Sequence, residues 1–132
     1  QKGAEVCVVG HSEIVGKPSA LLLLDKFCTT TVCHIGTQDL KAHTTKADVL
    51  VVAVGKAGLI KGEHIKPGAI VIDVGINRIK DAEGKTKTVG DVLFEEAVEI
   101  AGQITPVPGG VGTVTTAMLL KNVIDAARLQ GK

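Results

Sequence analysis

The sequence predicts an α/β fold in which a doubly wound parallel sheet has helices on both faces and carries a projecting β-hairpin. Hydrophobic residues make up 45% of the 132 residues and aromatic residues only 2%, so the core must consist of Val, Ile, Leu and Ala, which suits strands buried on both faces. Short β-branched runs alternate with segments of helical character, the order in which right-handed βαβ units build a parallel sheet. The length fits one domain, taken as residues 1–132.

Five short apolar runs are the expected strands, and most are rich enough in β-branched residues to favour a buried, pleated setting. They cover residues 5–9, 29–34, 48–54, 69–74 and 102–105. Helical or turn segments are expected at residues 17–26, 37–46, 62–66 and 92–101, and a long final helix at 113–129.

One segment interrupts this alternation of strands and helices. Residues 76–91, "INRIKDAEGKTKTVGD", alternate apolar and polar side chains around "DAEG", which is typical of a β-hairpin. An arm with little core of its own usually needs a partner surface. Two interpretations stay open: a homodimer contact through residues 76–91, or a solvent-exposed loop.

Composition and charge disfavour several classes of function. The chain has 15 basic and 14 acidic residues, a net charge of +1, and neither Trp nor Tyr, so it offers little support for a nucleic-acid surface. No apolar run reaches the ~18 residues of a membrane helix, and no signal-peptide pattern is present. The four histidines lie in separate segments without metal-ligand spacing. The cysteines, without C-x-x-C spacing, are interpreted as buried apolar residues of a reducing compartment, the cytoplasm: Cys7, Cys28 and Cys33.

The first strand runs into the loop "VCVVGHSEIVGKP", which resembles a nucleotide loop with displaced glycines. Gly10 leaves the strand, Gly16 enters the helix, and Ser12 stands where a dinucleotide fingerprint would have its second glycine. A serine hydroxyl can donate to a phosphate oxygen, and a helix N-terminus adds amide donors. The alternative is an ordinary strand-to-helix turn.

The second loop bears on the choice of cofactor. NAD sites usually have Asp or Glu at the end of the second strand to hold the ribose, whereas this strand ends "CHIGTQ", with His34 and no acid; Asp39 lies in the following turn. This favours NADP, with His11 and His34 as candidate phosphate donors. Both histidines are otherwise ordinary surface or partly buried polar residues.

Three further loops follow apolar strands and are glycine-rich. Gly55 and Gly75 each follow a strand, where a missing Cβ lets a ring or ribose lie on the backbone, although glycine also simply ends strands. In "ITPVPGGVGTVT", prolines and glycines give a stiff segment with exposed backbone, which suits a flat ligand edge better than it suits a linker. No nucleophile motif and no convincing general acid or base is found in the loops.

Four stretches, "VVGHSEIVGKP", "VAVGKAGLIKGEHIKPGAIVIDVGIN", "VGDV" and "ITPVPGGVG", together resemble the C-terminal cofactor domain of bifunctional methylenetetrahydrofolate dehydrogenase/cyclohydrolases. The resemblance runs from about Glu5 to Ala127 and implies a Rossmann-like fold. It also implies oxidation of 5,10-methylenetetrahydrofolate by hydride transfer to a nicotinamide cofactor, NADP or NAD, and hydrolysis of the methenyl product to 10-formyltetrahydrofolate. The family's catalytic Lys and Tyr, and an Asp that grips the pterin, belong to an N-terminal domain absent from this chain, so little or no turnover is expected of the chain alone.

The loops and the resemblance together nominate two sets of binding residues. Ile76 is expected beside the nicotinamide. The cofactor set is Gly10, His11, Ser12, Gly16, His34, Ile35, Val54, Gly55, Gly75 and Ile76. The set expected to bind tetrahydrofolate derivatives is Pro108, Gly109, Gly110, Val111 and Gly112.

The chain departs from the family pattern at three positions. Many members have Arg or another residue at the position of His11, and Ser or Arg at that of Ile35, where they help hold the 2′-phosphate; an apolar Ile35 makes NAD use credible. Thr113, in "GTVT" where "GPMT" is usual, softens the loop. Two other functions remain open: a non-catalytic nucleotide-binding and dimerisation module, and an amino-acid or quinate-type dehydrogenase domain, which "PVPGGVG" disfavours.

Overall fold

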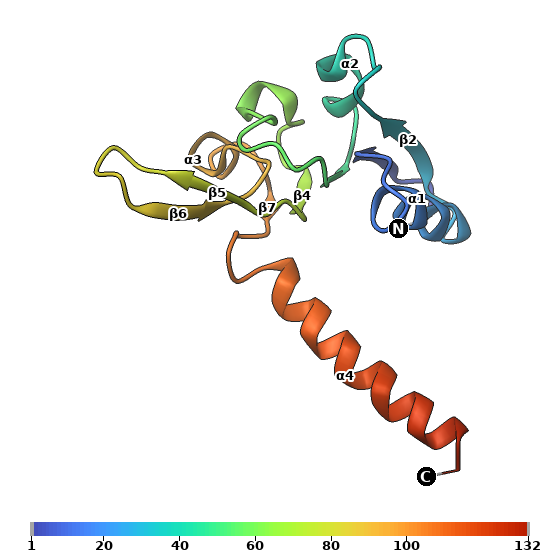
Figure 1. Ribbon diagram of the computed structural model, residues 1–132. Coiled ribbons are helices and arrows are strands. Elements are labelled where there is room, and N and C mark those ends of the chain that lie inside the picture. The colour runs from blue at the N-terminus through green and yellow to red at the C-terminus, as the bar shows by residue number, and fades with distance from the viewer. Residues whose placement is uncertain (1, 132) are drawn as a thin grey trace.

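The computed structural model describes residues 2–131, and its centre is a parallel sheet of five strands (Figure 1). The sheet order is β2-β1-β3-β4-β7. Because β1 pairs with β2 on one side and with β3 on the other, the chain winds outward in both directions from β1, which confirms the doubly wound prediction. The strands are β1 (Glu5–Val9), β2 (Thr29–Cys33), β3 (Val49–Val52), β4 (Ile70–Asp73) and β7 (Gln103–Ile104).

The main core lies on one face of this sheet. It contains side chains that alternate along the strands, among them Cys7, Val9, Leu50, Val52 and Val71, all at most 2% exposed. Three short helices cover it: α2 (Leu40–Thr44), the 3₁₀ helix η1 (Gly62–His64) and α3 (Phe94–Ala97). Aliphatic packing of this kind stabilises parallel strands, as the composition predicts.

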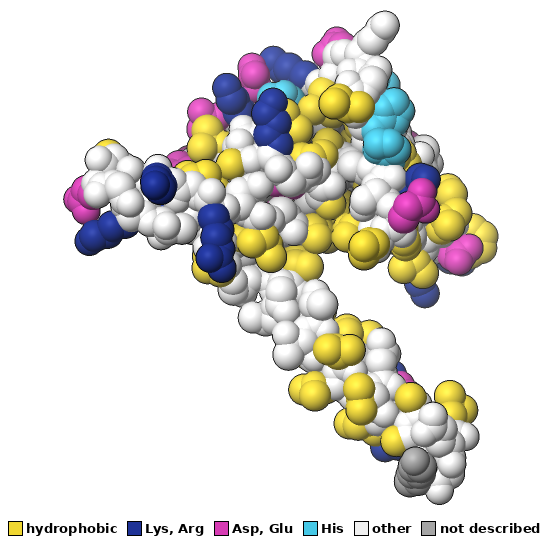
Figure 2. All heavy atoms as spheres, in the orientation of Figure 1, with side chains coloured by type: hydrophobic (Ala, Val, Ile, Leu, Met, Phe, Trp, Pro, Cys, Tyr) yellow, Lys and Arg dark blue, Asp and Glu magenta, His cyan; other side chains and the backbone are white. Residues whose placement is uncertain are grey.

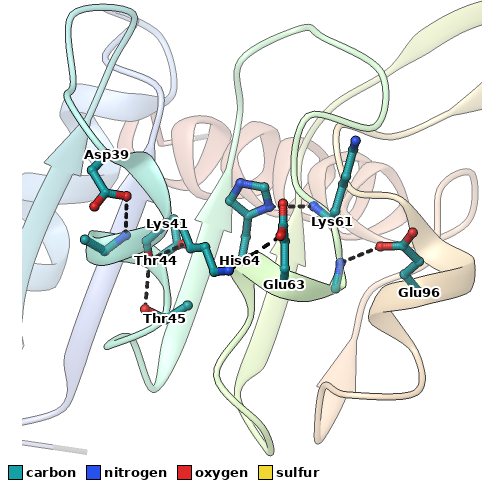
Figure 3. Close-up of polar contacts among 10 residues, drawn as sticks. Asp39, Lys41, Thr44, Thr45, Lys61, Glu63, His64 and Glu96 are labelled. Carbon is teal, nitrogen blue, oxygen red and sulfur yellow. Dashed lines mark hydrogen bonds and ion pairs between the residues drawn. The ribbon is translucent and has the colours of Figure 1, made fainter.

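Polar contacts join these three short helices to one another (Figure 3). Lys41 of α2 pairs with Glu63 of η1 at 3.5 Å, and the backbone N–H of Gly62 donates to Glu96 of α3 at 2.9 Å. Within η1, the N–H of Lys61 donates to Nδ1 of His64 at 3.1 Å. His64 is therefore a structural acceptor at the start of a turn.

The opposite face of the sheet is covered less completely. The helix α1 (Gly16–Asp25) contacts β2 and β1, and its Leu23 packs against the cluster of Val6, Val8 and Val51 on this face. Over β4 the covering ends, since Ile72 is only half-buried and Ile70 is 40% exposed. Helices lie on both faces, as predicted, but the second face stays open toward β4 and β7.

The long helix α4 (Val111–Leu129) stands away from the rest of the molecule (Figure 1). It begins two residues before the predicted position, and none of its residues is buried. Apolar side chains line it (Figure 2): Val114, Met118, Leu119, Leu120, Val123, Ile124 and Leu129. No helix within residues 2–131 combines the length and apolar character that crossing a membrane requires.

The predicted hairpin is present as the antiparallel pair β5 (Asn77–Lys80) and β6 (Thr86–Val89), which extends from the body (Figure 1). Oδ1 of Asp81 accepts from the N–H groups of Glu83 and Lys85, both at 2.9 Å, and so closes the turn. The hairpin is confirmed, and its contact with a second copy stays a prediction.

The segment 92–101, expected to be helical or a turn, contains one short helix, α3 at Phe94–Ala97, followed by a turn. Val92 is held extended in a parallel bridge with Ile60, and the N–H of Leu93 donates to the carbonyl of Ile60 at 2.7 Å. At the other end, the carbonyl of Ile100 accepts from Gly68 at 2.9 Å. Tertiary hydrogen bonds therefore end the helix at both sides.

Candidate functional site

Two pockets open at the carboxyl ends of the parallel strands, where ligands bind in doubly wound sheets. The first pocket, of about 500 Å³, lies at the point where the strand order reverses, between β1, β2 and β3. The second pocket, of about 350 Å³, lies between the loop after β4 and the start of α4. The first pocket is lined by Val9, Gly10, His11, Ser12, His34, Ile35, Thr37, Leu40, Ala53, Val54, Lys56 and Leu59.

The predicted binding residues divide between these pockets. Six of the cofactor set line the first pocket: Gly10, His11, Ser12, His34, Ile35 and Val54. The second pocket contains the rest of the nicotinamide side and the whole predicted folate set: Gly75, Ile76, Pro108, Gly109, Gly110, Val111 and Gly112. Gly16 and Gly55 line neither pocket.

Gly10 and Gly16 let the first loop pack tightly against the sheet. Gly10 has φ +123°, and a Cβ there would collide with the carbonyl group of Ala53 on the strand-end loop beside it. A Cβ on Gly16 would collide with the carbonyl group of Gly10. Gly16 is buried at the start of α1, so its role is to close the loop rather than to contact a ligand.

The hydroxyl of Ser12 organises the start of α1. Its Oγ accepts from the backbone N–H of Val15 at 3.1 Å and of Gly16 at 3.3 Å, while its carbonyl accepts from the N–H of Lys17 at 3.0 Å. The first amides of the helix are therefore already paired, contrary to the expectation that they would be available to a phosphate. The Ser12 O–H itself remains able to donate.

Two histidine rings meet at the first pocket, with the ring centroids of His11 and His34 5.1 Å apart. Nδ1 of His34 accepts from the N–H of Gly36 at 3.1 Å, which leaves Nε2 to carry the donor proton of the neutral ring. Ile35 beside them is fully exposed. The predicted pair of side-chain donors is thus brought together by the ends of β1 and β2.

No carboxylate is placed among the described residues that line the first pocket. Asp39, the nearest acid after β2, accepts from the N–H of Ala42 at 3.2 Å and caps α2. Lys56, on the loop after β3, adds a cation that the sequence analysis did not single out. The pocket is therefore suited to an anionic ligand.

Two buried aspartates, also missed in the sequence, hold the loops between the pockets. Asp91, fully buried, accepts through Oδ2 from the N–H groups of Val54 at 2.7 Å and Gly55 at 3.0 Å. The backbone N–H of Gly55 is thus held in place by a buried carboxylate. Because the loop after β3 is tied to Asp91, its position depends on the segment after β6.

Asp73 fixes the neighbouring loop after β4. Its Oδ1 accepts from the N–H groups of Gly75 at 2.9 Å and Asp91 at 3.1 Å, and its Oδ2 from that of Val92 at 3.0 Å. A Cβ on Gly75 would collide with the carboxylate of Asp91, and one on Gly90 with that of Asp73. The available signal in the sequence was the pairing of each acid with a nearby glycine, in "DVG" and "VGDV".

The burial of Asp73 also affects its ionisation. Desolvation raises the pKa of its carboxyl group above the ordinary value of 3.8, while the backbone donors of Val92, Asp91 and Gly75 oppose this rise. The negative charge of Asp91 raises the pKa further. Its oxygens are occupied by backbone donors, so we assign Asp73 a structural part in the site.

The second pocket is shaped by backbone. The Val107–Pro108 peptide is cis, Gly109 has φ +94°, and a Cβ on Gly110 would meet the carbonyl oxygen of Pro106. This arrangement keeps the segment close to Gly75 and Ile76 across the pocket. Arg78 and Thr88 of the hairpin, together with Thr115 of α4, are lining residues that the sequence analysis did not nominate.

The described residues that line the two pockets offer different groups to a ligand. Within residues 2–131 no group of three or more His, Cys, Asp or Glu side chains is positioned to hold a metal ion. The first pocket offers hydroxyl, imidazole and ammonium donors, and the second offers glycine backbone together with the side chains of Asp73, Arg78, Thr88 and Thr115. Such a surface can bind and align an extended anionic ligand with flat rings.

A family model and the sequences of known proteins match nearly the whole chain. Residues 1–131 match the family model described as "Tetrahydrofolate dehydrogenase/cyclohydrolase, NAD(P)-binding domain". A relative called "Bifunctional protein FolD" from Azorhizobium caulinodans is 57% identical over 128 residues, which are 97% of this chain and 44% of that protein. The chain therefore spans less than half the length of the curated relatives that it matches.

Solved structures of similar proteins share the fold. The bifunctional FolD dehydrogenase/cyclohydrolase of Campylobacter jejuni has a TM-score of 0.90 at 46% identity, covering 98% of this chain and 44% of that one. The Trypanosoma brucei FolD, solved with NADP cofactor and inhibitor, has a TM-score of 0.86 at 45% identity, covering 93% of this chain and 43% of that one.

Proposed function

Because this chain belongs to the family of tetrahydrofolate dehydrogenase/cyclohydrolase NAD(P)-binding domains, we propose that it binds NADP along the edge formed by its two pockets. The observation that carries the proposal is the composition of the first pocket, which contains Ser12, His11, His34 and Lys56 but no acid among its described lining residues. A carboxylate at the end of β2 would repel a 2′-phosphate and hold the free ribose of NAD instead.

The two pockets receive different parts of the ligand in this proposal. The adenosine half occupies the first pocket, at the switch point of the sheet, and the nicotinamide half reaches Gly75 and Ile76 in the second. The glycine-rich segment 108–112 then lines the side on which a tetrahydrofolate derivative binds. The fit is supported by the missing side chains at Gly109 and Gly112, where an added Cβ would meet no atom within 4 Å and the backbone is open to a ring edge.

Residues 1–132 supply the cofactor half of a larger enzyme in this proposal. The bound cofactor supplies the hydride acceptor, and the chain contributes alignment and a fixed electrostatic environment. In the complete enzyme we propose dehydrogenation of 5,10-methylenetetrahydrofolate and hydrolysis of the methenyl product, with the catalytic Lys, Tyr and Asp in a domain outside these residues. The free thiols of Cys7 and Cys33 support a reducing compartment, the cytoplasm.

Calorimetric titration of the chain with NADP and, separately, with NAD tests the cofactor assignment. We expect binding of both, with NADP tighter. Equal affinity for the two cofactors would contradict the inference that a pocket without an acid favours NADP. Absence of binding by either cofactor would show that this chain alone does not form the site. Joining the chain to the part of a relative that it does not match should give folate oxidation; persistent inactivity with intact cofactor binding would favour a non-catalytic nucleotide-binding module.

We also propose that the hairpin of β5 and β6 forms a homodimer contact. Its strands are mostly exposed, and Ile79 is a 40% exposed apolar side chain on them. Solution mass should fall from that of a dimer to that of a monomer when residues 79–88 are replaced by a short turn. An unchanged mass would leave the hairpin without this role.

A further inference from the structure

Lys56 is the one Lys or Arg among the described residues that line the first pocket. It lies on the loop after β3, whereas His34 and Ile35 lie at the end of β2, and the pocket that they share lies between them across the end of β1. Within residues 2–131 its ammonium group has no ion-pair partner. The charge of Lys56 is therefore available to a ligand of that pocket.

The backbone that carries Lys56 is held firmly. The two preceding residues, Val54 and Gly55, donate to the buried carboxylate of Asp91 at 2.7 and 3.0 Å. After it, the N–H of Leu59 donates to the carbonyl of Lys56 at 3.4 Å, and Leu59 itself lines the pocket. The side chain thus extends from a fixed point, so its four-carbon stem explores only the pocket's neighbourhood.

The backbone N–H groups at the start of α1 are already hydrogen-bonded within the chain, so they do not act as free donors to a phosphate. The N–H groups of Val15 and Gly16 are paired with Ser12 Oγ, and that of Lys17 with the Ser12 carbonyl. Helix amides, a frequent source of phosphate donors, are therefore already used. Ile35 offers no polar group at the end of β2. With no cation at the end of β2, Lys56 is the cationic side chain among the described lining residues with which a phosphate in this pocket can pair.

We propose that Lys56 is the specificity-determining residue for the 2′-phosphate of NADP, contributing the charge that Ile35 lacks, with His11 and His34 as auxiliary donors. This assignment rests on the proposed cofactor function. It places the charge on the loop after β3 rather than at the end of β2, where the sequence analysis sought it. A dianionic phosphate gains from a paired ammonium, whereas the ribose hydroxyl of NAD gains much less.

The test is a set of calorimetric titrations with NADP, NAD, adenosine 2′-phosphate and adenosine 5′-phosphate. For Lys56→Met we expect about tenfold weaker binding of NADP and of adenosine 2′-phosphate, the loss of one charge-assisted contact, and less than about twofold change for NAD. Lys56→Arg should keep the preference for NADP, since it keeps the charge. Lys26→Met, an exposed lysine after α1 that lines neither pocket, is the matched control and should bind like the unaltered chain.

The outcomes separate this assignment from the proposed function. If the unaltered chain prefers NADP and Lys56→Met keeps that preference, Lys56 is not the determinant although the chain binds the cofactor. Equal weakening of NADP and NAD would assign Lys56 to a group that both share, such as the pyrophosphate, and would also overturn the inference. If the unaltered chain binds none of the four compounds, the proposed function of the isolated chain fails, and the assignment fails with it.

Discussion

The side-chain amide of Asn77, on the hairpin strand β5, donates a hydrogen bond of 2.8 Å to Oδ1 of the buried carboxylate of Asp91. The other carboxylate oxygen accepts from Val54 and Gly55 at the end of β3. One buried side chain therefore connects the root of the hairpin to the loop of the first pocket. This relationship makes Asp91 a residue on which both features depend.

Replacing Asp91 by Ala should destabilise the chain by about 3 kcal/mol, because the N–H groups of Val54 and Gly55 and the amide of Asn77 lose their acceptor. Asn77→Ala should cost about 1 kcal/mol, and the double variant should cost less than the sum, since the two side chains share one hydrogen bond. Urea unfolding measures all three. Asp25→Ala, an exposed position at the end of α1, is the control and should change the free energy of unfolding by less than about 0.5 kcal/mol. A double variant whose loss of free energy equals the sum of the two single losses would contradict the coupling between Asp91 and Asn77.

The raised pKa of Asp73 predicts a particular dependence of stability on pH. Since burial raises the pKa, the folded chain holds the proton more tightly than the unfolded chain does. Its contribution to the free energy of unfolding therefore falls as pH rises from 3.8, the ordinary value, through the folded-state pKa, and is constant above it. Comparison with Asp73→Asn in urea unfolding from pH 3 upward isolates this group. The free energy of unfolding of the unaltered chain minus that of Asp73→Asn should fall as pH rises through that window. A value that rises with pH would contradict the raised pKa.

Gly110 and Gly112 offer a paired test of the segment that lines the second pocket. A methyl group on Gly110 would collide with the carbonyl oxygen of Pro106 and displace the segment, whereas one on Gly112 would meet no atom within 4 Å. In the complete enzyme proposed above, Gly110→Ala should lower kcat/KM for the proposed folate substrate by at least about tenfold, a loss typical of misplaced binding groups. Gly112→Ala should lose much less. Equal losses would mean that crowding of the ligand, and not displacement of the backbone, is responsible.

The buried cysteines should resist alkylation in the folded chain. Burial, together with the neighbouring Cys33, raises the pKa of the Cys7 thiol to about 12, and the two sulfur atoms lie 3.7 Å apart. Because the thiolate is the reactive form, iodoacetamide at pH 8 should leave Cys7 and Cys33 unmodified by mass spectrometry until urea unfolds the chain. The half-buried Cys28 should be modified first. Modification of Cys7 in the folded chain would contradict its burial.

Most of the fold is predictable from the sequence because parallel strands leave a strong pattern. Strands buried on both faces need continuous apolar, β-branched runs, and the predicted runs contain every strand of the parallel sheet. The hairpin is equally evident from its alternation around "DAEG". Short helices are less predictable: α3 is confined to Phe94–Ala97 because Val92 and Leu93 before it and Ile100 after it are committed to tertiary hydrogen bonds, which no local pattern records.

The sequence by itself determined which loops form the candidate site, since glycines and histidines after apolar strands must meet at one edge of a parallel sheet. Only the tertiary structure decided what each residue does there. It made Ser12 an acceptor for helix amides, left Gly16 and Gly55 out of the lining of both pockets, and placed Lys56 and His34 in the lining of the same pocket. It also selected Asp73 and Asp91 as buried supports, because a carboxylate can be buried only where several backbone donors converge on it, and that convergence joins segments far apart in the chain.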